Sequence, residues 1–430
     1  MKKPALLAVL AALAISVPSA WSQEEVYLQV TNPGLTSVVM ALPSPLARPG
    51  GESPAAKTFA DTLRADLEQT AVIRLLEPER ERLVDVDPSQ PALTRQRWRS
   101  VGAQFLLDSS VATAGAQLVA DVRLWDLASG EIAYSRRLQA PTNLAATMAH
   151  TLANELVRLF TGRPGPFLSR IAFISDRSGA KELWVMRWDG SEAQQLTSYR
   201  SITLGPAWSP DGQWLAFTSF LRGQPQLFLL RPTEGYLKPL STMPGVNSSP
   251  SFSPDGRRVA FAAGGDGNTD IFVADVETGT IVRLTSSRAI ETQPAWSPNG
   301  RQIAFTSTAS GRPQIHLMDA EGTNVRQLTF SDTFADEAAW APDGVRLAFT
   351  TMVDGRFQIA VLDMRTGTRT VVSGPGSNES PSWSPDGTML AFVSNRTGSK
   401  QIFITDAAGQ PRQLTRDGNN TAPAWVTQLQ

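Results

Sequence analysis

One motif recurs down the C-terminal part of this 430-residue chain and constrains its fold more than any other feature. Its full form is Pro-Ala-Trp-Ser-Pro-Asp-Gly followed by Leu-Ala-Phe, first complete at residues 206–217. The aromatic position returns at Phe252, Trp296, Trp340 and Trp383, in steps of 44, 44, 44 and 43 residues. A period near 44 residues with this content is typical of β-propeller blades, each of about four strands.

Two incomplete copies of the motif complement each other. Ile171-Ala172-Phe173 lacks an aromatic motif in front of it, and Pro423-Ala424-Trp425 lacks the apolar strand behind it. Because a propeller must pair or protect its sheet edges, we predict that a C-terminal strand at residues 420–426 joins the first blade and closes the ring. The Ala-Phe pairs give six blades, at Phe173, Phe217, Phe261, Phe305, Phe349 and Phe392.

The turns inside each repeat have a local explanation. In Ser-Pro-Asp-Gly, Pro fixes φ at the first corner, Asp bonds its own backbone and Gly takes a positive φ. Asp recurs in every full turn, with Asn299 replacing it once, which indicates turn chemistry rather than a calcium site. Side chains alternate between the two faces of a strand, so one Phe per blade should enter the core. Burial of each such Phe should stabilise the fold by about 2–3 kcal/mol. In one blade the expected strands are 294–297, 302–307, 314–318 and 324–329.

The part before the repeats has a different pattern. Helical spacing follows Ser53-Pro54 and recurs at residues 144–159, while residues 37–42, 103–111, 117–125 and 131–138 read as strands. We therefore expect an N-terminal α/β (α+β) domain at residues 23–163, followed by the six-bladed β-propeller at residues 164–430.

The first residues resemble an export signal. Lys2 and Lys3 precede an apolar run from Ala5 to Val17, and small residues follow up to Ser22. The run has about 13 residues, whereas a membrane span needs roughly 20. We predict a signal peptide at residues 1–22, cleaved after Ser22, and a mature protein in an exported compartment.

The composition excludes several kinds of chemistry. The chain has no Cys, so disulfides, thiol catalysis and cysteine metal sites are excluded. The histidines are His150 and His316, too few for a histidine-rich metal site, and no G-x-S-x-G or phosphate-loop motif occurs. The formal net charge of −1 gives no general attraction to nucleic acid. We read Gly264-Gly265-Asp266-Gly267 as a hairpin turn, and we expect no catalytic residue, no metal and no cofactor.

The segments just before each Pro-x-aromatic differ between repeats. They lead into the strand nearest the propeller axis and should open on one face of the ring, which we call the mouth. Such segments are ordinary solvated loops or, because a rigid scaffold holds them, a surface that binds a partner. Whether a cation binds near Glu291, Glu337 and Glu379 stays open. The candidate partner-binding residues at the mouth are Thr203, Asn247, Ser249, Glu291, Thr292, Glu337, Asn378, Glu379 and Asn420.

Several stretches are similar to those of the TolB family, the periplasmic component of the Tol-Pal envelope system. They are Leu159-Phe160-Thr161-Gly162, Ser169-Arg170-Ile171-Ala172-Phe173, the Pro-Ala-Trp-Ser-Pro-Asp-Gly repeats and Pro423-Ala424-Trp425. The resemblance implies a non-enzymatic periplasmic scaffold. It implies binding of the peptidoglycan-associated lipoprotein Pal at the propeller mouth and of TolA through the N-terminal segment, in support of outer-membrane integrity and cell division.

The resemblance also extends to individual residues. Thr292 falls where the family has a Thr before Glu-Pro, and Glu379 falls on a matching acid, whereas Val246 and Ser249 stand where familiar members have His and Ala. In the segment that the resemblance assigns to TolA, Tyr27 and Gln29 differ from the family pattern. That segment comprises Glu25, Val26, Tyr27, Leu28, Gln29 and Val30.

The resemblance further implies a monomer that neither inserts into a membrane nor binds nucleic acid. Two other functions stay open from the residues alone. One is a propeller enzyme of the periplasm, a polysaccharide lyase or hydrolase. The other is a chaperone that binds peptides or outer-membrane proteins.

Overall fold

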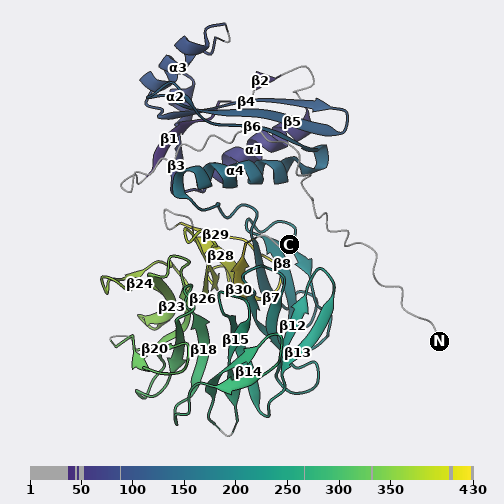
Figure 1. The fold of residues 1–430 in the computed structure, drawn as a ribbon, viewed down its shortest axis with the longest axis vertical. Helices are drawn as coiled ribbons and strands as arrows, with labels where there is room; N and C mark the ends of the chain where they lie inside the picture. Colours follow the sequence, from purple (N-terminus) through teal and green to yellow (C-terminus); the bar gives the residue numbers. More distant parts are fainter. Residues whose placement is uncertain are drawn as a thin grey trace, which may run out of the picture. The chain divides into compact units, whose positions relative to one another are not determined.

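The computed structural model describes residues 37–43, 46–47, 53–87, 89–265, 267–330, 333–405 and 410–427 (Figure 1). The predicted signal peptide and the segment from Glu25 to Val30 lie outside the described residues. The described chain forms two compact units, one within residues 37–168 and one from residue 169 onward.

The first unit is an α/β layer built on one sheet. The sheet has the order β3-β1-β4-β5-β6, with β2 also paired to β4. β1 runs parallel to β3 and β4, while β4, β5 and β6 form an antiparallel meander. The elements are β1 Val38–Ala41, β2 Leu46–Ala47, α1 Pro54–Glu68, β3 Ile73–Leu75, α2 Pro78–Glu81, α3 Pro91–Ser100, β4 Phe105–Ala114, β5 Gln117–Asp126, β6 Ile132–Pro141, the short 3-10 helix η1 Thr142–Leu144 and α4 Ala145–Thr161.

Helices α1 and α4 lie side by side and close this layer (Figure 1). The Ser53 hydroxyl accepts a hydrogen bond from the first turn of α1 at 3.1 Å, with Pro54 at the first helical position. Between the helices, Asp66 Oδ2 lies 2.7 Å from His150 Nδ1, and both side chains are buried. The predicted helices and strands of this unit are confirmed, but α2, α3 and β3 were not predicted.

The second unit is a closed propeller of six four-stranded sheets (Figure 1). The sheets are β30-β7-β8-β9, β10 to β13, β14 to β17, β18 to β21, β22 to β25 and β26 to β29. The strands are β7 Arg170–Ser175, β8 Glu182–Arg187, β9 Gln194–Gln195, β10 Thr203–Trp208, β11 Leu215–Ser219, β12 Gln226–Arg231, β13 Tyr236–Ser241, β14 Val246–Phe252, β15 Arg258–Gly264, β16 Asp270–Asp275, β17 Ile281–Arg283, β18 Glu291–Trp296, β19 Gln302–Ser307, β20 Gln314–Asp319, β21 Arg326–Gln327, β22 Ala335–Trp340, β23 Arg346–Val353, β24 Arg356–Asp363, β25 Arg369–Val371, β26 Asn378–Trp383, β27 Leu390–Ser394, β28 Gln401–Thr405, β29 Pro411–Gln413 and β30 Asn420–Val426.

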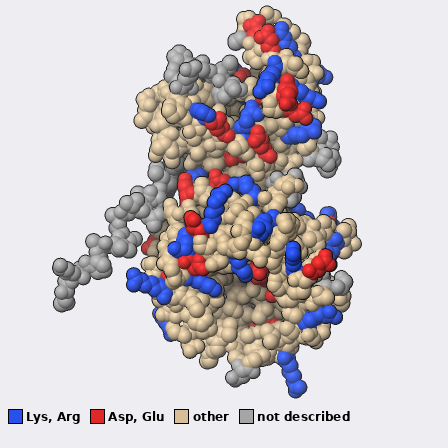
Figure 2. Space-filling view, turned by 180° about the vertical axis from the view of Figure 1, so that it is seen from behind, with Lys and Arg blue, Asp and Glu red and all other residues tan. Residues whose placement is uncertain are grey.

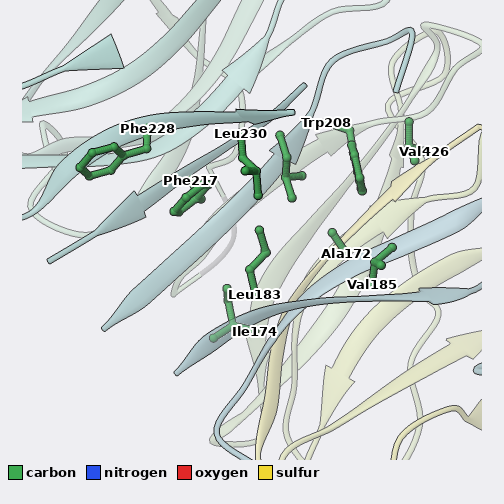
Figure 3. Close-up of a cluster of buried hydrophobic side chains, with 10 residues drawn as sticks. Ala172, Ile174, Leu183, Val185, Trp208, Phe217, Phe228, Leu230 and Val426 are labelled. Carbon is green, nitrogen blue, oxygen red and sulfur yellow. The ribbon is translucent and has the colours of Figure 1, made fainter. Parts of the chain in front are cut away.

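The C-terminal strand closes the ring, as predicted. β30 pairs antiparallel with β7, from Asn420 opposite Ser175 to Val426 opposite Arg170. The indole Nε1 of Trp425 donates to the Ser169 hydroxyl at 2.6 Å, and both groups are buried. Val426 also enters the hydrophobic cluster that the first blade shares with the second (Figure 3). The closing strand therefore contributes to the core as well as to the sheet edge.

Each blade contributes one fully buried Phe to the core. The six Phe residues of the Ala-Phe pairs are all 0% exposed, which confirms the alternation predicted from the sequence. Phe217 stacks on Phe228 of the next strand with ring centroids 6.1 Å apart, and Phe392 stacks on Phe403 at the same spacing. Each stacked pair lies within one sheet, and its two rings pack against side chains of the preceding blade.

The Ser-Pro-Asp-Gly turns have the hydrogen bonds that the sequence predicts. Asp255 Oδ1 accepts from the Ser253 hydroxyl at 2.5 Å and from the Arg257 N–H at 3.1 Å. Asn299 makes the same two bonds, from Ser297 at 2.8 Å and from Arg301 at 3.0 Å. The hydrogen bond from Ser253 lowers the pKa of Asp255 below its ordinary value. The Asp and Asn side chains therefore stabilise the turns in which they lie.

Removal of the closing strand should destabilise the propeller. Deletion of residues 420–430 exposes the edge of β7 and should lower the melting temperature strongly. Trp425→Ala should lower the free energy of unfolding by about 3–5 kcal/mol, because it removes a buried indole. Val282→Ala, on a side chain that is 55% exposed, should change it by less than about 0.5 kcal/mol. Circular dichroism during thermal and urea unfolding measures all three, and an unchanged melting curve of the truncated chain would contradict closure.

Candidate partner-binding site at the propeller mouth

The variable segments at the mouth share one backbone conformation. In every blade the pairing of the innermost strand with its neighbour shifts register near the start of the strand, which marks a β-bulge. A Pro follows the bulged residue in five of six blades, where its missing N–H costs no ladder bond. The bulged residues, with φ between +51° and +56°, are Gly205, Ser249, Gln293, Glu337, Ser380 and Ala422. The backbone is therefore repeated, and the side chains vary.

The residue two positions before each bulged residue is buried. Thr203, Asn247, Asn378 and Asn420 are 0% exposed, and Glu291 is 4% exposed. We call the junction between two adjacent blades a seam. The Asn378 amide donates to Gln358 Oε1 at 3.0 Å, and the Asn420 amide donates to Gln401 Oε1 at 2.8 Å, each across a seam to the preceding blade. The structure thus places these predicted site residues in the seams, where they position the mouth.

The other predicted residues of the mouth are partly exposed. They are Ser249, Thr292, Glu337 and Glu379, and Glu379 forms an ion pair with Lys400. The Glu337 carboxylate accepts hydrogen bonds from the Thr350 hydroxyl at 2.7 Å and from the Ser380 N–H and hydroxyl at 2.7 and 2.8 Å. Burial raises the pKa of Glu337 above its ordinary value, against the opposing effect of these donors. Glu337 therefore links two blades at the mouth.

An apolar arc, which the sequence prediction missed, covers part of the mouth. The residue three positions before the bulged residue is exposed and apolar in three consecutive blades, at Ile202, Val246 and Ile290, with exposures of 47%, 40% and 46%. Phe334 occupies this position in the next blade, the fifth, and Phe330, four residues earlier in the chain, is 73% exposed. The sequence signal was present, because the same offset carries an apolar residue in four of the six repeats, at Ile202, Val246, Ile290 and Phe334.

A polar arc completes the ring on the remaining blades. Ser377 and Asn419 replace the apolar residue there. A cavity of about 290 Å³ lies between the last and first blades, lined by Ile174, Asp176, Lys181, Lys400, Asn419 and Thr421. The N–H and side-chain amide of Asn419 donate to Asp176 at 2.6 and 2.9 Å, and these bonds lower the pKa of Asp176. The mouth thus presents an apolar arc beside an arc of both charges.

On the face of the propeller unit seen in Figure 2, Lys and Arg side chains lie interspersed with Asp and Glu. Within the described ranges, the helices are all too short or too polar to cross a bilayer. The described residues also contain no group of three or more acids or histidines placed to hold a metal ion.

The fold and the mouth define the class of proteins that carry a small α/β domain ahead of a closed six-bladed β-propeller. The family model described as the TolB beta propeller domain matches residues 157–429, and the model of the TolB amino-terminal domain matches residues 26–133. The chain belongs to the TolB family.

Individual relatives agree with this assignment. A Tol-Pal system protein TolB from Syntrophotalea carbinolica is 35% identical over 211 residues, 48% of this chain and 47% of the relative. Another from Desulfosudis oleivorans is 35% identical over 228 residues, half of each chain. The chain therefore spans about half the length of the curated relatives it matches. The crystal structure of TolB from Acinetobacter baumannii matches 91% of this chain and 97% of its own, with a TM-score of 0.78 at 24% identity, which shows a common fold.

The raised pKa of Glu337 predicts a pH dependence of stability. Because the folded state holds the proton more tightly than the unfolded state, it binds more protons between the ordinary value of 4.5 and the raised pKa. The free energy of unfolding should therefore fall as the pH rises through this window. Glu337→Gln removes this titration, so the wild type should lose more of its free energy of unfolding than the variant as the pH rises above 4.5.

Urea unfolding across this pH range measures the difference. Glu234→Gln, at an exposed acid in a turn between β12 and β13, is the control and should follow the wild type at every pH. Asp336, whose pKa burial also raises, is present in all three proteins. Parallel curves for the wild type and Glu337→Gln would contradict the prediction.

Proposed function

We propose that this chain is a non-enzymatic scaffold protein of the Tol-Pal system in the periplasm. Membership of the TolB family supports the assignment of this chain to the Tol-Pal system. The names of the relatives reported above mention no enzymatic activity. The proposal includes a signal peptide at residues 1–22, an N-terminal domain at residues 23–163 and a propeller at residues 164–430. The role of the protein is then to connect partners, in support of outer-membrane integrity and cell division.

The mouth is the proposed surface for a Pal-like peptidoglycan-associated lipoprotein. The observation that carries this proposal is the apolar arc, because three exposed aliphatic side chains at one rim position offer apolar area to a partner. The polar arc beside it, with the ion pair between Glu379 and Lys400, would orient the bound partner on the mouth through complementary charges. Within this surface Ser249, Thr292, Glu337 and Glu379 face the partner, whereas Thr203, Asn247, Glu291, Asn378 and Asn420 hold the seams that position them.

A second surface is proposed for a TolA-like inner-membrane protein. The segment from Glu25 to Val30 occupies the place that the family resemblance assigns to this contact. It lies outside the described residues, so the proposal rests on the sequence. The two partners would then use separate parts of one monomeric chain.

Substitutions at the mouth should weaken binding to the Pal-like lipoprotein. Glu379→Lys places two cations beside each other where an ion pair stood, and Thr292→Ile changes a partly exposed hydroxyl at the rim. Each should raise the dissociation constant at least about tenfold, on the order of 1.4 kcal/mol. Isothermal titration calorimetry with the mature protein and the periplasmic domain of the same organism's lipoprotein measures the change.

A matched control separates the mouth from general charge effects. Glu234→Lys reverses an exposed acid at the end of β12, and β12 begins at the mouth and ends at the opposite face. It should leave the affinity within about twofold of the wild type. Equal affinities for Glu379→Lys, Thr292→Ile and the wild type would contradict the mouth assignment, and no binding by the wild type would contradict the proposed partner.

Removal of the N-terminal segment should abolish binding to the TolA-like partner only. A mature chain that begins after Thr31 should lose binding to the periplasmic domain of the TolA-like protein and should keep the two compact units of the fold. Pull-down and calorimetry with each partner measure this, with melting temperature as the folding control. Undiminished TolA binding by the shortened chain would contradict the second surface.

A further inference from the structure

The fifth blade carries a longer hairpin at the mouth than the other blades. Its strands β23 and β24 have eight residues each, whereas the second and third strands of the other blades have five to seven. The two strands pair up to Val353 opposite Arg356, and Asp354 and Gly355 form the turn, both with positive φ. The pairing of β22 with β23 ends two residues earlier, so the hairpin extends beyond the innermost strand.

The extended hairpin carries apolar side chains beside the start of β22. Met352 on β23 stands opposite Phe357 on β24. Phe334, just before β22, places its ring on that of Phe357, with the centroids 5.1 Å apart. All three side chains are partly exposed. Neighbouring side chains on adjacent strands pack together, so these three form one apolar surface, which we call the aromatic row.

Hydrogen bonds on both sides hold the aromatic row in place. The Thr351 hydroxyl donates to the Phe334 carbonyl at 3.0 Å. On the other side the Phe357 N–H donates to the Ser377 hydroxyl of the sixth blade at 3.3 Å. A surface that is ordered in advance loses less conformational freedom when a partner binds, so the aromatic row is suited to binding.

The same three positions have other chemistry in the other blades. They lie one residue nearer the mouth than the first buried residue of the innermost strand and its two partners across the sheet. The position of Phe357 is aromatic in the fifth blade only. A requirement of the propeller itself would recur in every blade, so an aromatic row in one blade indicates a function. The corresponding residues are Asn419, Asp176 and Lys181 in the first blade, Ile202, Phe220 and Pro225 in the second, Val246, Gly264 and Thr269 in the third, Ile290, Thr308 and Pro313 in the fourth, and Ser377, Asn395 and Lys400 in the sixth.

We propose that the aromatic row receives an aliphatic or aromatic side chain of the partner at the mouth and determines the specificity of that contact. The proposal rests on the proposed function, because the partner is the Pal-like lipoprotein. A few aromatic side chains in partly buried positions carry much of the binding energy in protein interfaces. The row of the sixth blade begins at Ser377 and ends at Lys400, which is paired with Glu379, so it disfavours an apolar side chain. The apolar side chain of the partner is therefore directed to the fifth blade.

Substitutions in the row test this contact in the full mature chain. Phe357→Ala and Phe334→Ala each remove one ring, and Phe357→Leu keeps an apolar side chain. Tyr236→Ala is the matched control, because Tyr236 is an aromatic residue with 51% exposure that pairs with Arg231 at the end of β12, on the face opposite the mouth. Calorimetry with the periplasmic domain of the lipoprotein measures affinity, and circular dichroism during heating verifies that each variant folds.

The two Ala variants should each raise the dissociation constant at least about tenfold. Phe357→Leu should stay within about threefold of the wild type, because it conserves most of the apolar volume. Tyr236→Ala should stay within about twofold. If one Ala variant does not fold, the other and the comparison of Phe357→Leu with the wild type still measure the contribution of the row.

Three results would overturn the proposal. Equal affinities of the wild type and the two Ala variants, with weaker binding by Glu379→Lys, would remove the aromatic row from the interface and leave the proposed function standing. No binding by the wild type would overturn the proposed partner together with the row. A dimer of the wild type in sedimentation velocity that Phe357→Ala dissociates would assign the row to a contact between two copies of this chain instead.

Discussion

The pairing of β30 with β7 is the constraint on which the rest of the propeller depends. It joins segments from opposite ends of the repeat region, and the buried bond from Trp425 to Ser169 spans 256 residues. The cavity of the mouth exists because of this pairing, since Ile174 and Asp176 come from the first blade and Asn419 and Thr421 from the last segment. Closure therefore forms the polar arc as well as the sheet edge.

Most of the propeller could be predicted from the sequence because its determinants are local. A strand period of two places Phe305 in the core whatever the rest of the chain does. The Ser-Pro-Asp-Gly turn needs only its own side chains, as the bonds of Asp255 show. The count of blades and the closing strand then follow from two incomplete repeats, because an open ring would leave an edge unpaired.

The mouth was harder to predict because its geometry depends on neighbouring blades. Asn378 and Asn420 look like polar loop residues, but the bulge after each one turns its side chain into the seam, where an amide of the preceding blade receives it. Ile202 and Val246 look like core residues of a strand, yet they lie just before or at the start of the innermost strand and stay exposed. In the first unit, α3 was missed because its sequence is rich in Arg, and only Thr94 and Trp98 are buried.

The seams show how a repeat can specialise without losing its fold. The bulge keeps the backbone of all six innermost strands alike, so a seam residue can change while the blade remains intact. At this position Ala335 has no polar side chain, and Asn378 forms a hydrogen bond to Gln358 across its seam. Glu291 has one buried carboxylate oxygen, Oε2, that accepts no hydrogen bond from the described residues. The side chains that vary on a constant backbone are therefore where we propose that a partner protein binds, at the rim of the mouth.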